Sequence, residues 1–337
     1  MNAALARVLD GAAPTRSETR GLFDALIHGD LDTVEIAALL VALKLGGETA
    51  GQIAGAAQAL RDAALEFPRP SYGFADIVGT GGDGAHTINI STAVAFVAAE
   101  AGLPVARHGN RSVSSRCGAA DLLETFGVNL EMSPDLARRA LDEIGVTFLF
   151  APHYHAGIRH ATPARTALAT RTLFNVLGPL VNPARPPLML VGVYAPALCT
   201  VVAETLKRLG CERALVVHGL GLDEIALHGE TRAAALHDGR VSKCRFTPAD
   251  FGVREFPLAA IVGGAPADNA RAIRAVLEGR GDPAHAAAVA VNAAALFVLG
   301  GLAADFRSGY ELARRTIANG RAFARVERLV AISQGET

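Results

Sequence analysis

The chain has 337 residues, half of them apolar, and a formal net charge of −1. These values suit one large or two smaller packed domains, and they exclude a disordered chain or a strongly basic nucleic-acid binder. Four cysteines form no CxxC pair, which favours reduced thiols in a cytoplasmic protein over a zinc ribbon or a disulfide framework.

Residues 1–67 are predicted to form helices. The first residues lack a basic start followed by an apolar core, so we expect no secretory signal. Asp32 and Glu35 have capping-box spacing before an apolar run, and a pair of glycines ends that helix. Thr49 and Gln52 repeat the signal before a helix that we expect to end near Phe67.

After a proline-rich linker, short apolar runs alternate with helical stretches. Such alternation predicts an α/β fold with a mainly parallel central sheet and helices on both faces. Ligands of these sheets bind outside the carboxyl ends of the strands. We expect strands at residues 77–78, 104–106, 146–150, 188–194 and 214–218.

One later segment, from Ala286 to Leu302, carries no charge and is nearly long enough to span a bilayer. It is mostly alanine and valine, with Asn292 in its middle and two glycines at its end. We therefore interpret it as a buried helix in an alanine-rich core.

The first predicted strand runs into a glycine-rich loop. Gly79, Gly81 and Gly84 formally match the dinucleotide fingerprint, and glycines let a backbone approach a ligand closely. We expect the next helix only from about Ala93, about two turns later than that fingerprint requires. A ribose-binding acid is also missing after the second strand, although Arg107 there leaves NADP open. We therefore favour a cradle for phosphate or pyrophosphate at a helix N-terminus.

Residues 107–116 read Arg-His-Gly-Asn-Arg-Ser-Val-Ser-Ser-Arg and follow the second predicted strand. Three arginines, a histidine and three serines predict an exposed loop and not a core segment. Such a loop has the donors and the positive charge to hold phosphate and hydroxyl oxygens. A merely solvated basic loop is the alternative.

Two adjacent carboxylates, Asp223 and Glu224, follow the last buried strand. Adjacent carboxylates repel each other unless a cation joins them. Mg²⁺ typically takes one or two carboxylates together with water and substrate phosphates. Because this loop and the two preceding ones should meet at one sheet edge, we favour a metal–phosphate site over a plain helix N-terminus.

Between Ile144 and Ala203 the chain contains no Asp or Glu. This gap predicts a local electropositive surface suited to an anionic substrate. A basic face that pairs with acids elsewhere in the fold is an equally good interpretation. The basic residues of this segment are His153, His155, Arg159, His160, Arg165, Arg171 and Arg185.

Together these motifs resemble the anthranilate phosphoribosyltransferase family, in the expected order and over nearly the whole chain. The matching segments are residues 79–83, 89–92, 108–115, 151–155, 171–183 and 221–225. The resemblance implies a small helical domain over residues 1–70, to which helices from about 160–185 return. It implies a large α/β domain of the nucleoside phosphorylase/phosphoribosyltransferase type over residues 71–337. It also implies a homodimer, joined through the helical domain, in tryptophan biosynthesis.

The resemblance further implies that anthranilate receives the phosphoribosyl group of 5-phosphoribosyl 1-diphosphate, without a classical acid or base. Arg107, Asn110 and Arg165 would position the reactants, and Ser91, Asp223 and Glu224 would hold Mg²⁺, as two ions. Gly79, Asn110, His155 and Arg165 would contact anthranilate. Phosphoribosyl diphosphate would contact Gly79, Gly82, Asp83, Thr87, Asn89, Ile90, Ser91, Thr92, Arg107, His108, Gly109, Asn110, Arg111, Ser112, Val113, Ser114 and Ser115.

Three positions depart from the family pattern, which commonly has Lys at Arg107, Ser at Ala119 and Pro at Ala156. Arg107 keeps the charge, but guanidinium and ammonium groups are not equivalent at a tight phosphate site. Ala119 lacks a hydroxyl that would contact the phosphoribosyl group.

Other functions stay open on the sequence alone. A related phosphoribosyltransferase or nucleoside phosphorylase would act on another aromatic amine or base. A non-catalytic paralogue would use the basic edge to bind nucleic acid, although the near-zero net charge disfavours it. An NADP-dependent oxidoreductase is disfavoured by the late helix.

Overall fold

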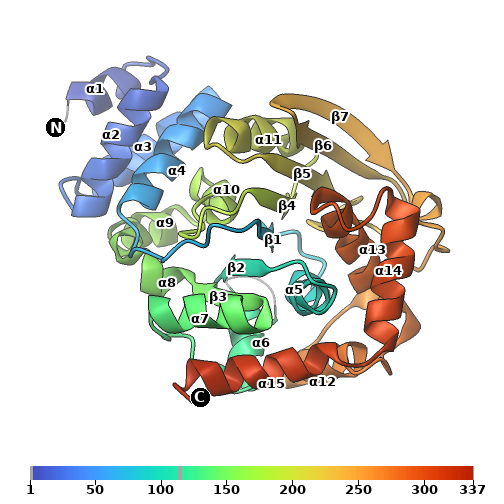
Figure 1. Ribbon diagram of the computed structural model, residues 1–337. Coiled ribbons are helices and arrows are strands. Elements are labelled where there is room, and N and C mark those ends of the chain that lie inside the picture. Colours follow the sequence, from blue (N-terminus) through green and yellow to red (C-terminus); the bar gives the residue numbers. More distant parts are fainter. Residues whose placement is uncertain (1–2, 113–115, 337) are drawn as a thin grey trace.

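The structure is a computed structural model that describes residues 3–112 and 116–336. Its N-terminal part is a bundle of helices, at the upper left of Figure 1. Both predicted capping boxes are confirmed, at Asp32 and at Thr49. The helices are α1 (Ala3–Leu9), α2 (Arg16–His28), α3 (Thr33–Gly46) and α4 (Ala50–Asp62).

The prediction that the fourth helix runs to about Phe67 was wrong, because α4 ends at Asp62. The chain leaves the helix so that the Phe67 side chain, 5% exposed, joins the core of the α/β part. An apolar side chain near a helix end does not reveal which of two cores will bury it.

The centre of the molecule is a seven-stranded sheet in the order β3-β2-β1-β4-β5-β6-β7. The first five strands of that order are parallel, as predicted, and β6 and β7 add an antiparallel hairpin. The strands are β1 (Ala75–Gly79), β2 (Val105–Gly109), β3 (Val146–Phe150), β4 (Leu188–Gly192), β5 (Arg213–His218), β6 (Thr231–His237) and β7 (Arg240–Phe246).

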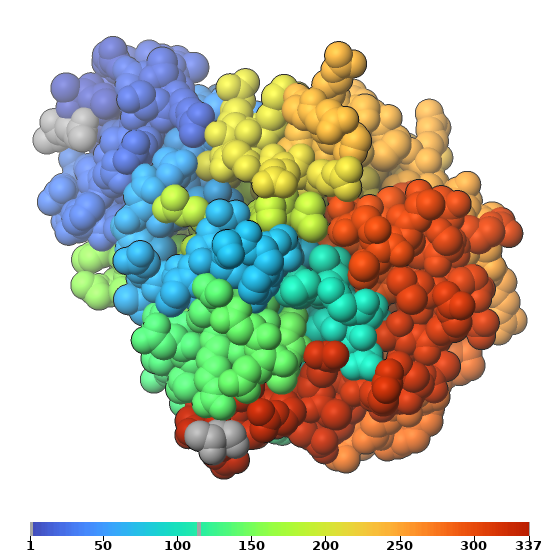
Figure 2. Space-filling view, in the orientation of Figure 1, coloured from blue at the N-terminus to red at the C-terminus, as the bar shows by residue number. Residues whose placement is uncertain are grey.

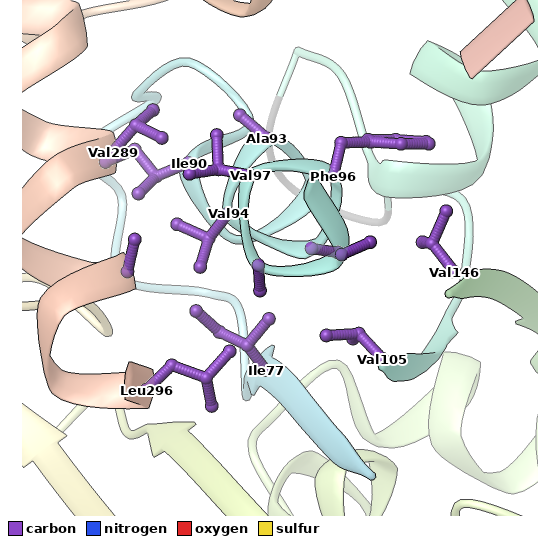
Figure 3. Close-up of a cluster of buried hydrophobic side chains, with 14 of the residues drawn as sticks. Ile77, Ile90, Ala93, Val94, Phe96, Val97, Val105, Val146, Val289 and Leu296 are labelled. Atoms are coloured by element: carbon purple, nitrogen blue, oxygen red, sulfur yellow. The ribbon is translucent and has the colours of Figure 1, made fainter. Parts of the chain in front are cut away.

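Each face of the sheet has its own apolar core, because side chains alternate along a strand. On one face, Ile77 and Val105 pack with helix α5 (Ile90–Glu100), which also contacts α13 (Pro283–Leu299) (Figure 3). On the other face, Val78 and Val191 lie in the core that includes α11 (Leu198–Arg208) and the bundle.

The remaining helices cover the sheet and its edges (Figure 1). Helix α13 is the uncharged segment that we expected to be a buried helix, and its residues 287–297 are all buried. No helix of the described residues is long and apolar enough to cross a membrane. The other helices are α6 (Ala119–Thr125), α7 (Pro134–Ile144), α8 (Ala151–Tyr154), η1 (Ala156–Ala161), α9 (Thr162–Leu168), α10 (Phe174–Leu177), η2 (Gly178–Leu180), η3 (Pro248–Phe251), η4 (Leu258–Ile261), α12 (Pro266–Leu277), α14 (Phe306–Ala318) and α15 (Ala322–Ser333).

The segment from η1 to η2 packs against the N-terminal bundle. The rings of Phe23 and Phe174 lie 5.7 Å apart between centroids, and Lys44 donates to the Thr170 hydroxyl at 2.6 Å. Arg61 donates through Nε to the Leu180 carbonyl oxygen at 2.6 Å. In Figure 2 the blue N-terminal residues form a lobe at one end of the molecule. We propose that residues 160–185 belong with the helical domain over 1–70, and the rest of 71–337 with the α/β domain.

Candidate active site

Three loops meet where β1, β2 and β5 end. The Gly81 amide donates to Asp223 Oδ2 at 2.6 Å, which joins the first loop to the third. Arg107 Nη2 donates to Ser91 Oγ at 2.8 Å, which joins the second strand to the start of α5. The predicted convergence of glycine-rich, basic and acidic segments at one edge is therefore confirmed.

Helix α5 begins at Ile90, and the expected start at about Ala93 was wrong. Asn89 precedes the helix, but its side chain does not cap it. Instead, its Nδ2 donates to the Cys117 carbonyl oxygen at 3.1 Å, and its Oδ1 accepts from Asn269 Nδ2 at 2.8 Å. Ser91 consequently stands in the first turn of the helix.

The dinucleotide alternative loses its geometric basis. Helix α5 starts six residues after Gly84, so the third glycine of the fingerprint does not pack helix on strand. In the segment between Gly84 and helix α5, Thr87 forms an isolated antiparallel bridge with Val262. The His86 carbonyl oxygen accepts from the Gly263 amide at 2.7 Å. This segment is therefore fixed against the loop that precedes α12.

The prediction that residues 107–116 form an exposed loop was wrong at its start. Arg107 and His108 lie in strand β2 and are only 6% and 2% exposed. Burial lowers the pKa of Arg107, and the carboxylates of Asp76, Glu224 and Asp223 oppose this effect. A buried guanidinium is tolerated here because an acid of strand β1 and two acids of the loop after β5 lie near it.

The buried ring of His108 is fixed by a hydrogen bond and by the ring of a second histidine. Its Nδ1 donates to the Gly178 carbonyl oxygen at 3.1 Å, and its ring lies edge-on to that of His155, with centroids 5.2 Å apart. Burial lowers the pKa of His108 to about 3 and that of His155 to about 4, so both rings are neutral at neutral pH. His155 Nε2 donates to the Val181 carbonyl oxygen at 2.9 Å.

The rest of the basic segment is organised by Asp121 at the start of α6. Asp121 Oδ2 accepts from the amides of Ser112 and Gly118, at 3.0 and 2.8 Å. Arg111 pairs with Asp121 and with Glu124, at 3.3 and 2.7 Å. Asn110 is exposed. The predicted contacts of Val113, Ser114 and Ser115 lie outside the described residues.

Asp223 and Glu224 carry pKa values far above those of ordinary carboxyl groups. Burial raises the pKa of Asp223 to about 7, and the nearby charge of Asp83 adds to the rise. Burial raises the pKa of Glu224 to about 8, Asp223 adds to that rise, and Arg107 opposes it. Carboxylates crowded in this way favour either protons or a cation.

Close packing fixes this acidic pair on the strand ends. A Cβ added to Gly79 would lie 2.2 Å from Asp223 Oδ2, and one added to Gly192 would lie 1.5 Å from the Asp223 carbonyl oxygen. Asp83 also reaches the pair, because its Oδ2 lies 3.4 Å from the Asp223 amide. Only glycine fits at the ends of β1 and β4 while the acidic loop lies there.

The oxygen donors of Asp223, Glu224 and Ser91 suit a hard cation such as Mg²⁺. Among the described residues, no three His, Cys, Asp or Glu side chains cluster closely enough to hold an ion by themselves. An ion here would therefore need water or phosphate oxygens to complete its coordination, which is the usual state of Mg²⁺ in phosphate-handling sites.

Two arginines from the acid-free segment differ in what they contact. Arg165 is half-buried, with its guanidinium 4.9 Å from the centre of the Phe174 ring, and it forms no ion pair with a described residue. Arg171 donates to the Gly82 carbonyl oxygen and stacks 4.1 Å from the Tyr194 ring centre. By contrast, Arg185 pairs with Asp62 at 3.2 Å, so the predicted basic surface is partly neutralised.

Four residues of this site were missed as candidates in the sequence. The sequence did contain a signal for Arg171, because this basic residue lies in the acid-free segment that predicts an electropositive surface. Asp76 and Asn182 are buried side by side, with Asn182 Nδ2 donating to Asp76 Oδ2 at 2.8 Å. No pattern in the sequence joins residues so far apart. Asp121 had only the spacing of a helix start.

A parallel sheet with a glycine-rich loop and an acidic loop at one edge, joined to a helical bundle, is the architecture of a class of glycosyltransferases. Residues 71–323 match the family described as "Glycosyl transferase family, a/b domain". Residues 2–64 match "Glycosyl transferase family, helical bundle domain".

Within that class, the chain belongs to the anthranilate phosphoribosyltransferase family. It is 54% identical over 326 residues to the Aeromonas hydrophila anthranilate phosphoribosyltransferase, covering 97% of this chain and 95% of that protein. The crystal structure of the Thermus thermophilus enzyme superposes with a TM-score of 0.94 at 42% identity, over 98% of this chain and 99% of that one. The Saccharomyces cerevisiae enzyme in complex with PRPP and Mg gives 0.89 at 26% identity, over 99% of both chains.

Proposed function

We propose that this chain transfers the phosphoribosyl group of 5-phosphoribosyl 1-diphosphate to the amine of anthranilate. The products would be N-(5-phosphoribosyl)anthranilate and pyrophosphate, a step of tryptophan biosynthesis. The convergence of the glycine-rich loop with Asp223 and Glu224 carries this proposal, because it joins a phosphate cradle to cation donors. Relatives that are named for this activity and match nearly the whole chain support it.

The proposed site uses Mg²⁺, bound as two ions by Ser91, Asp223 and Glu224 with phosphate oxygens and water. The yeast relative in complex with PRPP and Mg supports this cation. The raised pKa values of Asp223 and Glu224 support it too, because a cation would relieve their repulsion. When bound, Mg²⁺ would neutralise charge on the pyrophosphate leaving group.

The other site residues would position the two substrates. The backbone from Gly79 to Asp83 and the guanidinium of Arg107 would orient the pyrophosphate, with Asp83 acting through water or metal. Residues 87–92 and 107–115 would complete the contacts with phosphoribosyl diphosphate. Because the aromatic amine is neutral at cytosolic pH, no strong base is needed to make it a nucleophile. Orientation and electrostatic stabilisation would provide most of the acceleration.

Anthranilate is proposed to bind between Arg165 and the end of β2. Arg165 would hold its carboxylate, and Asn110, His155 and the backbone of Gly79 would orient its ring. The Arg165 guanidinium supports this role, because it is half-buried against the Phe174 ring and no described acid pairs with it. A carboxylate in that position would form a charge-assisted, bidentate pair.

A fluorescence assay tests the proposed reaction. The protein is mixed with anthranilate, 5-phosphoribosyl 1-diphosphate and Mg²⁺, and the loss of anthranilate fluorescence is followed. We expect the double variant Asp223→Asn, Glu224→Gln to lose Mg²⁺-dependent turnover. The control replaces two exposed acids, Glu311→Gln with Glu327→Gln, and should behave as the parent.

Three outcomes would reject parts of the proposal. Turnover with another aromatic amine or a base, but not with anthranilate, would indicate the related transferase or phosphorylase. Unchanged Mg²⁺ dependence in the Asp223, Glu224 double variant would reject the metal site. Binding of nucleic acid without any turnover would indicate the non-catalytic paralogue.

We propose that the protein is a cytoplasmic homodimer whose two subunits contact each other through the helical bundle. Helix α3 supports the dimer, because Val34 and Leu45 on it are 76% and 82% exposed. A neighbouring bundle would cover these side chains. Sedimentation equilibrium of the parent and of Leu45→Glu tests this, and a parent that remains a monomer at micromolar concentration would reject the dimer.

A further inference from the structure

The acidic loop, residues 219–226, is not held by the sheet ladder. Apart from a tight turn between Gly219 and Leu222 and a long contact from the Asp223 amide to Asp83 Oδ2 at 3.4 Å, three of its amides donate to side chains outside the loop. The Gly221 amide donates to His218 Nε2 at 3.1 Å. The Ile225 amide donates to Asn292 Oδ1 at 3.1 Å, and the Ala226 amide donates to Thr231 Oγ1 at 3.0 Å.

Each of these three acceptors is buried and fixed on its own element. Asn292 is fully buried in α13, where its Nδ2 donates to the Ala288 carbonyl oxygen at 2.9 Å. Thr231, at the start of β6, is also fully buried. A buried amide or hydroxyl costs free energy unless its hydrogen bonds are made. The hydrogen bonds from the loop amides therefore stabilise both the loop and the buried side chains that accept them.

His218 fits only in one tautomer. Its Nδ1 lies 2.8 Å from the Val193 carbonyl oxygen, which can only accept, so Nδ1 must carry the hydrogen. Its Nε2 is then a lone pair that accepts from the Gly221 amide. The ring thereby ties the turn of the acidic loop to the end of β4.

The loop has little freedom to move on its other side. A Cβ added to Gly219 would lie 2.3 Å from the Glu224 carbonyl oxygen, and Gly192 lies directly under Asp223. The loop is packed closely at Gly192 and Gly219 on one side and is hydrogen-bonded to three side chains on the other. This packing keeps Asp223 and Glu224 in one arrangement. The positions of these two carboxylates therefore depend on residues that carry no charge toward a metal.

We propose that Asn292, Thr231 and His218 are positioning residues that set the affinity of Asp223 and Glu224 for the divalent cation. This inference rests on the proposed function, because it assumes that this pair holds the metal. None of the three would touch substrate or ion. They would act by fixing the backbone of the acidic loop, so their loss should weaken metal binding more than anthranilate binding.

Thr231→Val tests the inference, because valine keeps the shape and removes the acceptor of the Ala226 amide. We expect the Mg²⁺ concentration for half-maximal turnover to rise about fivefold to tenfold, the effect of one lost hydrogen bond. The KM for anthranilate should change less than twofold. Thr231→Ser keeps the hydroxyl and should restore the parent Mg²⁺ dependence. Mn²⁺ binding, followed by the electron paramagnetic resonance of the free ion, should weaken in parallel without any turnover.

The matched control is Thr205→Val, the same change at a fully buried threonine of α11. Its hydroxyl donates to the Val201 carbonyl oxygen at 2.8 Å and makes no contact with the acidic loop. It should lose stability with unchanged Mg²⁺ and Mn²⁺ affinity. Should Thr231→Val not fold, Asn292→Ala provides the second test, with Val291→Ala on the same helix as its control.

The outcomes separate this inference from the proposed function. If Asp223→Asn weakens Mg²⁺ and Mn²⁺ binding but Thr231→Val behaves like Thr205→Val, the positioning role is rejected and the metal site stands. If Asp223→Asn leaves both affinities unchanged, the metal site itself is rejected, and the inference with it. Weaker cation binding in Thr231→Val and Asn292→Ala, but in neither control, supports the inference.

Discussion

Gly79 is where a single added methyl group tests the proposed site most directly. Its built Cβ would lie 2.2 Å from Asp223 Oδ2 and 2.8 Å from Asp223 Cγ. Since real Cβ atoms essentially never lie within 3.0 Å of such a neighbour, the carboxylate would have to move by about 1 Å. That movement would also disturb its hydrogen bond from the Gly81 amide, now 2.6 Å long.

A misplacement of about 1 Å can lower a rate by about 100-fold. We therefore expect Gly79→Ala to lower kcat/KM by about that factor and to raise the Mg²⁺ requirement. Stability should change little, because the carboxylate can swing away from the new methyl group. The measurement is the initial loss of anthranilate fluorescence over a range of Mg²⁺ concentrations, with the midpoint of thermal unfolding determined in parallel.

Gly73→Ala is the matched control for this change. Gly73 lies just before β1, and a Cβ built there meets no atom within 4 Å. Both variants remove the same flexibility from the unfolded chain. If Gly79→Ala kept kcat/KM and Mg²⁺ dependence within about threefold of Gly73→Ala, Asp223 would not have to stay where the structure places it, and its proposed role would be refuted.

Two further predictions address the acceptor and a buried acid. Arg165→Ala should raise the KM for anthranilate about tenfold or more, because the variant loses a charge-assisted pair with the substrate carboxylate. The KM for phosphoribosyl diphosphate should change little. If steady-state kinetics showed equal effects on both KM values, the assignment of Arg165 to anthranilate would be rejected. Asp76 is fully buried, and burial raises its pKa to about 7. Because the folded state holds this proton more tightly, the stability from Asp76 is present below about pH 4 and is lost as the pH rises to about 7. Between pH 5 and pH 8, Asp76→Asn should therefore lose on the order of 2–3 kcal/mol less stability than the parent in urea unfolding, and equal losses would show that Asp76 is ionised in the native protein.

Local signals in the sequence were enough to predict the helical bundle and the parallel strands. A capping box such as that of Asp32 and Glu35 works within one helical turn, so its residues adjoin in any fold that contains the helix. The hairpin of β6 and β7 had a local signal too, at the turn of Asp238 and Gly239. Both residues have positive φ there, as the tight turn between hairpin strands requires, yet the flanking polar residues concealed the strands.

The site was predictable at the level of loops and less so for single side chains. Strand order is not needed to know that loops after parallel strands share an edge, so the meeting of Gly81 with Asp223 could be expected. The hydrogen bonds of Asn292 and Thr231 to the acidic loop could not. They depend on how α13 and β6 lie on the sheet, and a lone buried asparagine in an apolar helix gives no hint of its partner.

Arg107 shows why charge in a sequence is a poor guide to burial near such a site. Exposure was predicted from the composition of its own segment, but the acids that compensate its guanidinium come from β1 and from the loop after β5. The same contact works in both directions, because Arg107 opposes the rise in the pKa of Glu224. A cation bound by Asp223 and Glu224 would therefore compete with Arg107 for their charge. Two of the guanidinium nitrogens, Nε and Nη1, are buried without a partner among the described residues. These two nitrogens are closed off from solvent, so the charges of Asp76, Glu224 and Asp223 compensate the guanidinium where direct hydrogen bonds to these atoms are missing.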